Sequence, residues 1–197
     1  MANKLRRKLK RSYSLIRSSL SDRDISAWIT DNFYIIDKHY RKTVSDKTAL
    51  RFNGLYEILL KYCDDHDFTP EPRTLIAHLS ASKRDFSYRE LCAVSNLLSV
   101  CAISKIADSI SSGEKTRILP LAVKMLISLS DPCFSDVIPS VWRPEELLKK
   151  HEKDYELFDS ETKSQYRMRI SSYAREKRIS EADATLELAE RANRSKV

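Results

Sequence analysis

The sequence predicts an all-α fold, an irregular multi-helix bundle of about seven to nine helices with a basic amphipathic helix at its N-terminus. Two observations favour this class. The 197 residues include only two glycines, whereas sheet proteins need many tight turns of the kind that glycine permits. Apolar residues recur at helical spacing along most of the chain, and a content of 42% hydrophobic and 32% charged residues is typical of a folded domain.

The first twenty residues form a basic segment with helical periodicity. Its apolar residues, spaced by three or four, are Leu5, Leu9, Tyr13, Ile16 and Leu20. Its basic residues are Lys4, Arg6, Arg7, Lys8, Lys10, Arg11 and Arg17. These seven side chains account for the whole formal charge of +7, because the rest of the chain has as many acidic as basic groups. We therefore divide the chain into a basic arm, residues 1–20, and a single helical domain, residues 21–197.

Start signals predict the next helices of the domain. Ser21 with Asp24 has the spacing of a capping box and opens a helix over residues 25–42. A further helix covers roughly residues 48–63. Thr69 as N-cap, with Pro70 at the first helical position, predicts a short helix that ends near residue 80.

The middle of the chain is its most apolar part. Ser87 with Glu90 forms the clearest capping box in the sequence and begins a long helix that Gly113 can close. This helix has apolar residues on more than one face, so we expect it to be central. A second buried helix covers residues 118–129, with Pro120 in its first turn.

Three helices complete the domain after an irregular connection. Pro144 fits the first turn of a short helix through residue 151. The next helix begins at Asp159 or Ser160. The last begins at Ser180, which Asp183 caps, and continues toward the C-terminus.

Groups that could carry out a reaction are sparse and scattered. The four histidines fall in different elements, and none lies in a nucleophile motif. Cys63 and His66 have a metal-like spacing, but no second pair completes a site, so we expect a polar loop. Two isolated glycines cannot form a phosphate-binding loop. We expect no catalytic residue, no cofactor and no metal in this segment.

Cysteine usage and the absence of apolar runs bear on location. The four cysteines lack paired spacing, so we expect reduced thiols in the cytoplasm. The basic N-terminus is not followed by the apolar stretch of a signal peptide, and no run is long enough to span a membrane. The protein can still lie at the inner face of the cell membrane.

Two stretches resemble a known family. WITDNFYIID, residues 28–37, resembles the Trp-x-x-Asp-Asn-Phe-Tyr signature near the N-terminus of cyclic β-1,2-glucan synthases. DYELFDSETKSQYRMRI, residues 154–170, resembles their later Tyr-x-x-Met-Asp-Phe-x-Thr-Arg-Asp-x-Tyr-Arg segment. The matching residues are Trp28, Asp31, Asn32, Phe33, Tyr34, Tyr155, Asp159, Thr162, Tyr166 and Arg167. The second stretch departs from the family pattern at Phe158, Ser160 and Lys163.

The resemblance covers residues 22–193 and implies a role within a larger enzyme. The family consists of large bacterial membrane glycosyltransferases that transfer glucose from UDP-glucose into β-1,2-glucan and carry a glycoside-phosphorylase-like region. Their transferase and phosphorylase-like motifs lie beyond the region of resemblance, so no residue here inherits a catalytic role. The implied function is a non-catalytic scaffold or docking domain that contacts adjoining catalytic domains; whether the parent is an active enzyme stays open.

The matching residues also have simple structural roles. Asp159 can cap its helix with Thr162 in reach, and Tyr166 can bury its ring while its hydroxyl finds a partner. Arg167 can bind a carboxylate on a neighbouring helix or on an adjoining domain. Asp31 and Asn32 are unfavourable in mid-helix, so each is expected to have a tertiary hydrogen-bond partner.

The basic arm leaves several functions open. On an anionic membrane its charges would contact lipid while its apolar residues enter the surface. In a stand-alone module it would bind nucleic acid, although the neutral domain and the lack of a recognition motif disfavour this. It could also dock onto a protein partner, or form a solvated and frayed terminus.

Overall fold

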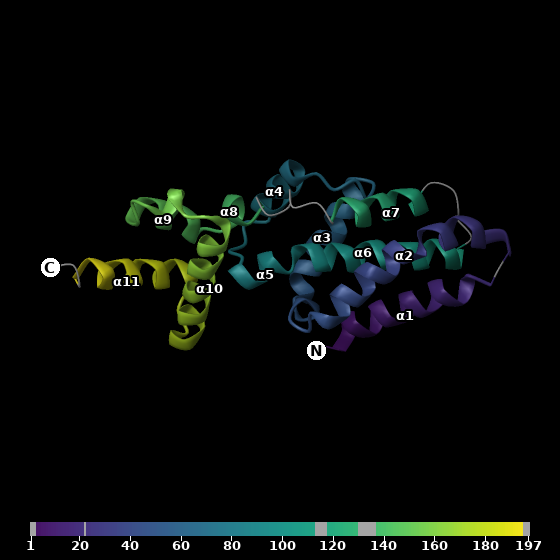
Figure 1. Ribbon diagram of the computed structural model, residues 1–197, viewed down its shortest axis with the longest axis horizontal. Helices are drawn as coiled ribbons and strands as arrows, with labels where there is room; N and C mark the ends of the chain where they lie inside the picture. Colours follow the sequence, from purple (N-terminus) through teal and green to yellow (C-terminus); the bar gives the residue numbers. More distant parts are fainter. Residues whose placement is uncertain (1–2, 22, 113–117, 130–136, 195–197) are drawn as a thin grey trace.

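The computed structural model describes residues 3–21, 23–112, 118–129 and 137–194 (Figure 1). Within these ranges the chain forms 11 α-helices and no strand, and 83% of it is helical. Nine of the helices have at least seven residues, which agrees with the predicted number. The predicted all-α bundle is therefore confirmed. No helix in the described ranges is both long and apolar enough to cross a bilayer.

One apolar helix organises the N-terminal bundle. Helices α1 (Asn3–Ser19), α2 (Arg23–Ser45), α3 (Asn53–Asp65) and α7 (Ile118–Ser128) pack around α6 (Val94–Ser112) (Figure 1). Leu97, Leu98, Ile103 and Ile106 of α6 point to different sides, and each is fully buried. Such a helix needs neighbours all round, so its predicted central position is confirmed.

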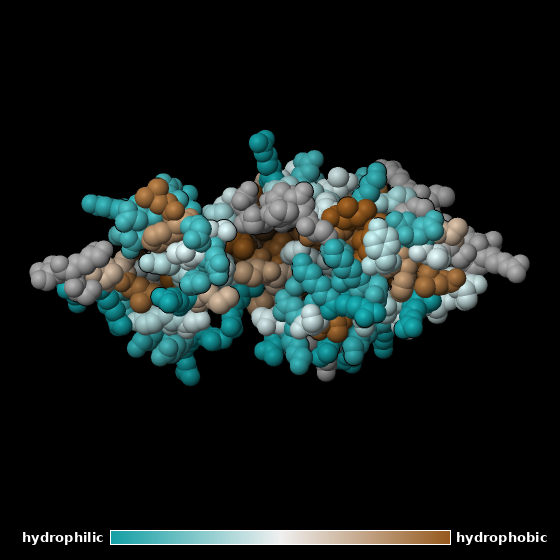
Figure 2. Space-filling view, in the orientation of Figure 1, coloured by the Kyte–Doolittle hydropathy of each residue, from teal (hydrophilic) through white to brown (hydrophobic). Residues whose placement is uncertain are grey.

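A second group of helices extends away from this bundle. Three short helices connect the two: α4 (Pro72–Ala81), α5 (Tyr88–Cys92) and α8 (Val137–Val141), whereas η1 (Ala49–Arg51) packs inside the bundle. The C-terminal group consists of α9 (Pro144–His151), η3 (Tyr155–Leu157), α10 (Ser160–Lys177) and α11 (Glu181–Arg194). Helix α10 stands across α11 (Figure 1), and a notch separates this group from the bundle on the face in Figure 2. The buried apolar residues nevertheless form one core, from Leu5 to Ala184.

Several predicted helix starts are confirmed. Ser87 and Glu90 form a complete capping box at α5, Asp159 caps α10, and the Ser180 hydroxyl accepts from the Asp183 amide at 3.0 Å at the start of α11. Each of these signals is local, because donor and acceptor lie within three residues of one another. The Ser21–Asp24 box depends on the Asp24 side chain and the helix end depends on Gly113, both of which lie outside the described part of the structure, so both stay predictions.

Two details of the predicted helices are wrong. Helix α4 begins at Pro72 with Glu71 as its N-cap residue, not at Pro70 with Thr69, because Pro72 takes the first helical position instead. The long helix predicted after Ser87 is interrupted at Ala93. The Ala93 amide donates to the carbonyl oxygens of Glu90 and Leu91, which ends the first helical segment. The capping box therefore starts the five-residue α5, and the central helix α6 begins separately.

The apolar face of the N-terminal arm lies in the protein core. Leu5 is 3% exposed, Leu9 and Ile16 are 0% exposed, and the main contact of α1 is with α6. The Tyr13 ring stacks on Tyr40 at 3.7 Å, and its hydroxyl donates to Asp37 at 2.6 Å. The expectations that this face enters lipid or frays in solvent are therefore wrong. An amphipathic period specifies an apolar neighbour but does not say whether it is lipid or protein.

Candidate functional site

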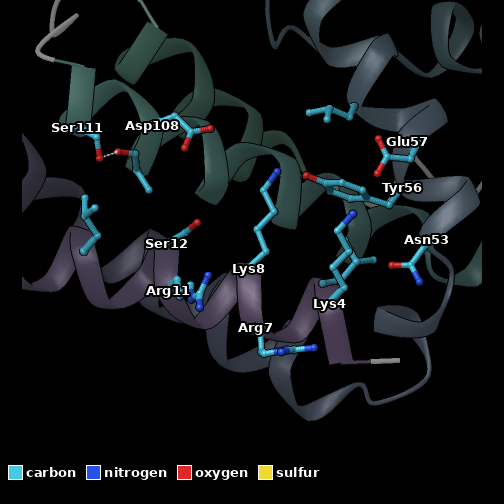
Figure 3. Close-up of a pocket in the computed structure, with 14 residues that line it drawn as sticks. Lys4, Arg7, Lys8, Arg11, Ser12, Asn53, Tyr56, Glu57, Asp108 and Ser111 are labelled. Atoms are coloured by element: carbon cyan, nitrogen blue, oxygen red, sulfur yellow. Dashed lines mark hydrogen bonds between the residues drawn. The ribbon is translucent and has the colours of Figure 1, made fainter. Parts of the chain in front are cut away.

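A groove runs beside α1 and is bounded on its other sides by α3 and α6 (Figure 3). Its volume is about 610 Å³. The polar side chains that line it are Lys4, Arg7, Lys8, Arg11, Ser12, Asn53, Tyr56, Glu57, Asp108 and Ser111. The groove contains four of the seven basic residues of the arm, Lys4, Arg7, Lys8 and Arg11, so we treat it as the candidate binding site.

Helical spacing explains why α1 lines the groove with cations. Lys4, Lys8 and Arg11 follow one another at intervals of four and three residues, which places them on one edge of the helix. Burial of Leu5 and Leu9 against the core fixes the rotation of α1 and so directs this edge toward α3. The four cations of the groove face only two carboxylates, which gives it a net positive charge.

Cationic and acidic groups stand on different walls of the groove. Figure 3 shows Lys4 and Lys8 rising from α1, with Glu57 of α3 on one side and Asp108 of α6 on the other. Within the described ranges none of these four side chains has an ion-pair partner within 4 Å. Opposite charges thus face the same space without neutralising one another directly.

Tyr56 contributes a buried hydroxyl to the same wall as Glu57. The residue is 2% exposed, and its hydroxyl lacks a hydrogen-bond partner within the described structure. Burial raises the pKa of Tyr56, and the facing Ser104 hydroxyl, which lies outside hydrogen-bond geometry, lowers it less. The phenol therefore keeps its proton at neutral pH. Lys8 Nζ lies 5.3 Å from the centre of the ring, so the Lys8 ammonium group lies over the face of Tyr56 (Figure 3).

The other basic residues of the arm lie outside the groove. Lys10 and Arg17 are exposed, and Arg6 is half-buried with its Nε enclosed. An anionic surface could meet Lys10 and Arg17 only on the polar side of α1, because the apolar side is covered. Contact of all seven basic residues with an anionic surface stays a prediction.

The two stretches that resemble the glucan synthases, residues 28–37 and 154–170, are the family stretches. The first lies on α2, and its side chains are buried to different extents. Phe33 is half-buried and stacks on Tyr13 of α1, with 5.8 Å between ring centres. Tyr34 points outward and is 70% exposed. Asp31 is exposed and has no hydrogen bond in the described structure, so the prediction of a tertiary partner is wrong for Asp31. That prediction stays open for Asn32, and the Trp28 side chain lies outside the described part.

The second family stretch builds a buried polar cluster. Arg167 of α10 donates two hydrogen bonds to Glu145 of α9, from Nε at 2.9 Å and from Nη2 at 2.7 Å. The Tyr155 hydroxyl donates to the same carboxylate at 3.0 Å. Burial and the Glu145 carboxylate both raise the pKa of Tyr155, so it remains a donor. The predicted contact of Arg167 with a carboxylate on a neighbouring helix is confirmed.

The start of α10 also uses residues of this stretch. The Asp159 carboxylate accepts from the Thr162 amide at 2.7 Å and from the Thr162 hydroxyl at 3.2 Å, as predicted. These hydrogen bonds lower the pKa of Asp159. Tyr166 is half-buried, and its ring packs against Phe158 with 5.3 Å between centres. Helix α2 lies in the bundle and α10 in the C-terminal group, so the two family stretches do not meet (Figure 1).

One polar contact that the sequence did not reveal joins the C-terminal group to the bundle. Glu181 at the start of α11 accepts from the Tyr88 amide at 2.8 Å and from the Trp142 indole at 2.6 Å. In the sequence Glu181 resembles an ordinary acidic residue in the first turn of a helix. Its partners lie 93 and 39 residues away, so no local signal identifies them.

The remaining groups that could carry chemistry are possible metal ligands and the cysteine thiols. The described ranges contain no group of three or more His, Cys, Asp or Glu side chains that could hold a metal ion. Cys63 and Cys101 are buried as free thiols, and Cys92 is free and exposed. Cys133 lies outside the described ranges.

Comparisons with known proteins add no relative. No protein-family model, no curated protein and no solved structure matches the chain.

Proposed function

We propose that the chain is a non-catalytic helical docking domain of a polypeptide that resembles the cyclic β-1,2-glucan synthases. The parent reaction would be glucosyl transfer from UDP-glucose into β-1,2-glucan at the cytoplasmic face of the membrane. The observation that carries the proposal is the cluster of Tyr155, Arg167 and Glu145. Tyr155 and Arg167 of the second stretch both donate to Glu145 inside the domain, which supports a structural role for them.

Exposed apolar residues within the family stretches support a docking role. Tyr34 is 70% exposed, Leu157 is 83% exposed and Met168 is 58% exposed, and all three belong to residues 28–37 or 154–170. Large apolar side chains at the surface mark contacts with other proteins when they serve a function. The partner on this proposal is an adjoining catalytic domain of the same polypeptide or complex.

The reading frame that contains the Val197 codon provides the test. The proposal predicts that the frame continues into membrane-spanning helices and a glycosyltransferase domain, or that such a gene lies beside it. A stop codon after Val197, in a locus without a transferase, would contradict it. Incubation of the 197-residue chain with UDP-glucose should yield no glucan.

A further inference from the structure

The groove between α1, α3 and α6 has two features that together indicate a ligand. Lys4, Lys8 and Arg11 have no ion-pair partner within the described residues, and the groove contains a 98% buried tyrosine whose hydroxyl has no hydrogen bond there. Buried donors are seldom left without an acceptor in folded proteins, and the neighbouring Ser104 hydroxyl also lacks a hydrogen bond in the described structure, so an acceptor that enters the groove would satisfy Tyr56. Tyr56 is therefore the group that distinguishes this groove from an ordinary basic surface.

The two walls differ in the chemistry that they offer. Lys4, Lys8 and Arg11 on α1 are donors that suit a phosphate group. Glu57 and Asp108 on the facing walls only accept hydrogen bonds and would repel a second anion. A ligand that satisfies both walls has one anionic end and a hydroxyl-bearing end.

We propose that this groove binds a phosphate ester of a small polyol. The phosphate would lie against Lys4, Lys8 and Arg11, and the hydroxyl groups would donate to Glu57 and Asp108. Lys8 has a flexible four-carbon side chain, so a small movement of its ammonium group would expose the Tyr56 hydroxyl to the same phosphate. The ligand could be a soluble polyol phosphate or the headgroup of a glycerol-based lipid.

The carboxylates argue against a polyanion as the natural occupant. A nucleic acid backbone repeats its negative charge and offers Glu57 and Asp108 no matching donors. The proposal needs only the groove, and it does not depend on the resemblance to glucan synthases. Failure of either proposal therefore leaves the other standing.

Titration calorimetry of the 197-residue chain with sn-glycerol 3-phosphate tests the site, with inorganic phosphate and glycerol as reference ligands. We expect glycerol 3-phosphate to bind at least about tenfold more tightly than either reference, because only it satisfies both walls. Asp108→Asn should reduce that preference. Equal affinity for inorganic phosphate and glycerol 3-phosphate would overturn the proposal.

Matched variants of α1 separate the site from general charge. Lys8→Met should weaken binding roughly tenfold, whereas Lys10→Met, the same change on the exposed side of the helix, should change it less than about twofold. Tyr56→Phe should weaken binding roughly fivefold without lowering thermal stability, since it removes an unsatisfied group. Equal effects of Lys8→Met and Lys10→Met would overturn the proposal.

Vesicles identify the source of the phosphate ester. If the chain binds phosphatidylglycerol vesicles and Lys8→Met abolishes this binding, the ligand is a lipid headgroup. If the chain binds only soluble glycerol 3-phosphate tightly, the ligand is a metabolite. Both outcomes support the site. Equal binding to phosphatidylserine vesicles, which have the same net charge but no diol, would contradict it. Tighter binding to random DNA than to either phosphate ester would contradict it as well.

Discussion

Arg167 and Glu145 form the most deeply buried ion pair in the described part of the chain. The Arg167 side chain is 12% exposed and the Glu145 side chain 3% exposed. Their geometry is bidentate, and the Tyr155 hydroxyl satisfies the carboxylate further. A pair of this kind is sensitive to the loss of one partner, since the remaining charge stays buried without compensation.

Arg167→Met should therefore lower the free energy of unfolding by about 3 kcal/mol or more, measured by urea denaturation. The double variant Glu145→Met with Arg167→Met should regain most of this loss, because apolar side chains can replace a buried pair. A loss below about 1 kcal/mol for Arg167→Met, or purely additive effects, would show that the cluster contributes little to the fold.

His39 of α2 is buried where α2 meets α6 and α7, and its protonation makes the free energy of unfolding depend on pH. It is 2% exposed, and its Nδ1 lies 3.0 Å from the Ser99 hydroxyl oxygen. The pKa of His39 is lowered from 6.5 to about 4, mainly by burial and to a smaller extent by the nearby charges of Lys42 and Lys38. Below pH 6.5 the unfolded chain binds a proton at this imidazole, whereas the folded chain does so only near pH 4.

The free energy of unfolding should thus fall as the pH decreases from 6.5 toward 4, by at most about 3 kcal/mol from this one group. Denaturant titrations at pH 7 and pH 5 measure the change. His39→Gln should show a smaller decrease between the two pH values than the wild type. An identical decrease would show that other groups cause the effect.

At the scale of an element, the two sides of helix α1 have different roles. Its apolar stripe belongs to the core and its basic edge lines the groove.

Leu9→Ala should lower the free energy of unfolding by about 2 to 5 kcal/mol, as expected for a fully buried leucine. Chemical denaturation checks this, with Lys10→Ala as the control. Wild-type stability of Leu9→Ala would show that α1 is a separable arm.

Local signals allowed several helix starts to be predicted, but not the starts of α4 and α6 or the short helix α8, which lies in a stretch predicted to be irregular. The caps at Ser87, Asp159 and Ser180 depend on residues three positions apart, so the sequence contains the whole interaction. The break at Ala93 could not be predicted, because the apolar run continues through it. The groove could not be predicted either, since Tyr56 and Asp108 approach Lys8 only after α3 and α6 pack together.

At the scale of the whole molecule, Glu181 connects the C-terminal helices to the rest. Its carboxylate accepts from Tyr88 of α5 and from Trp142, which follows α8 and is 1% exposed. The Tyr88 hydroxyl adds a contact to Ser164 of α10 at 2.9 Å. These bonds couple α11 and α10 to α5, which in turn contacts the central helix α6.

Glu181→Ala should leave the Tyr88 amide and the Trp142 indole without their acceptor and cost about 2 kcal/mol. Hydrogen exchange at the Tyr88 amide should become faster, and the near-ultraviolet circular dichroism of Trp142 should weaken. Glu190→Ala, whose side chain is 70% exposed on the same helix, is the control. Unchanged exchange at Tyr88 would show that the two groups are held together by apolar contacts alone.

The proposed docking role is tested most directly by glucosyl transfer from UDP-glucose in the proposed parent polypeptide, with Leu157→Ser compared with Ile127→Ser. Both residues are exposed, at 83% and 53%, but only Leu157 lies in a family stretch, and neither variant should change the stability of the isolated domain by more than about 0.5 kcal/mol. The account predicts reduced transfer for Leu157→Ser, wild-type transfer for Ile127→Ser and none for the 197-residue chain alone. Turnover by that chain, or full activity of Leu157→Ser, would contradict it.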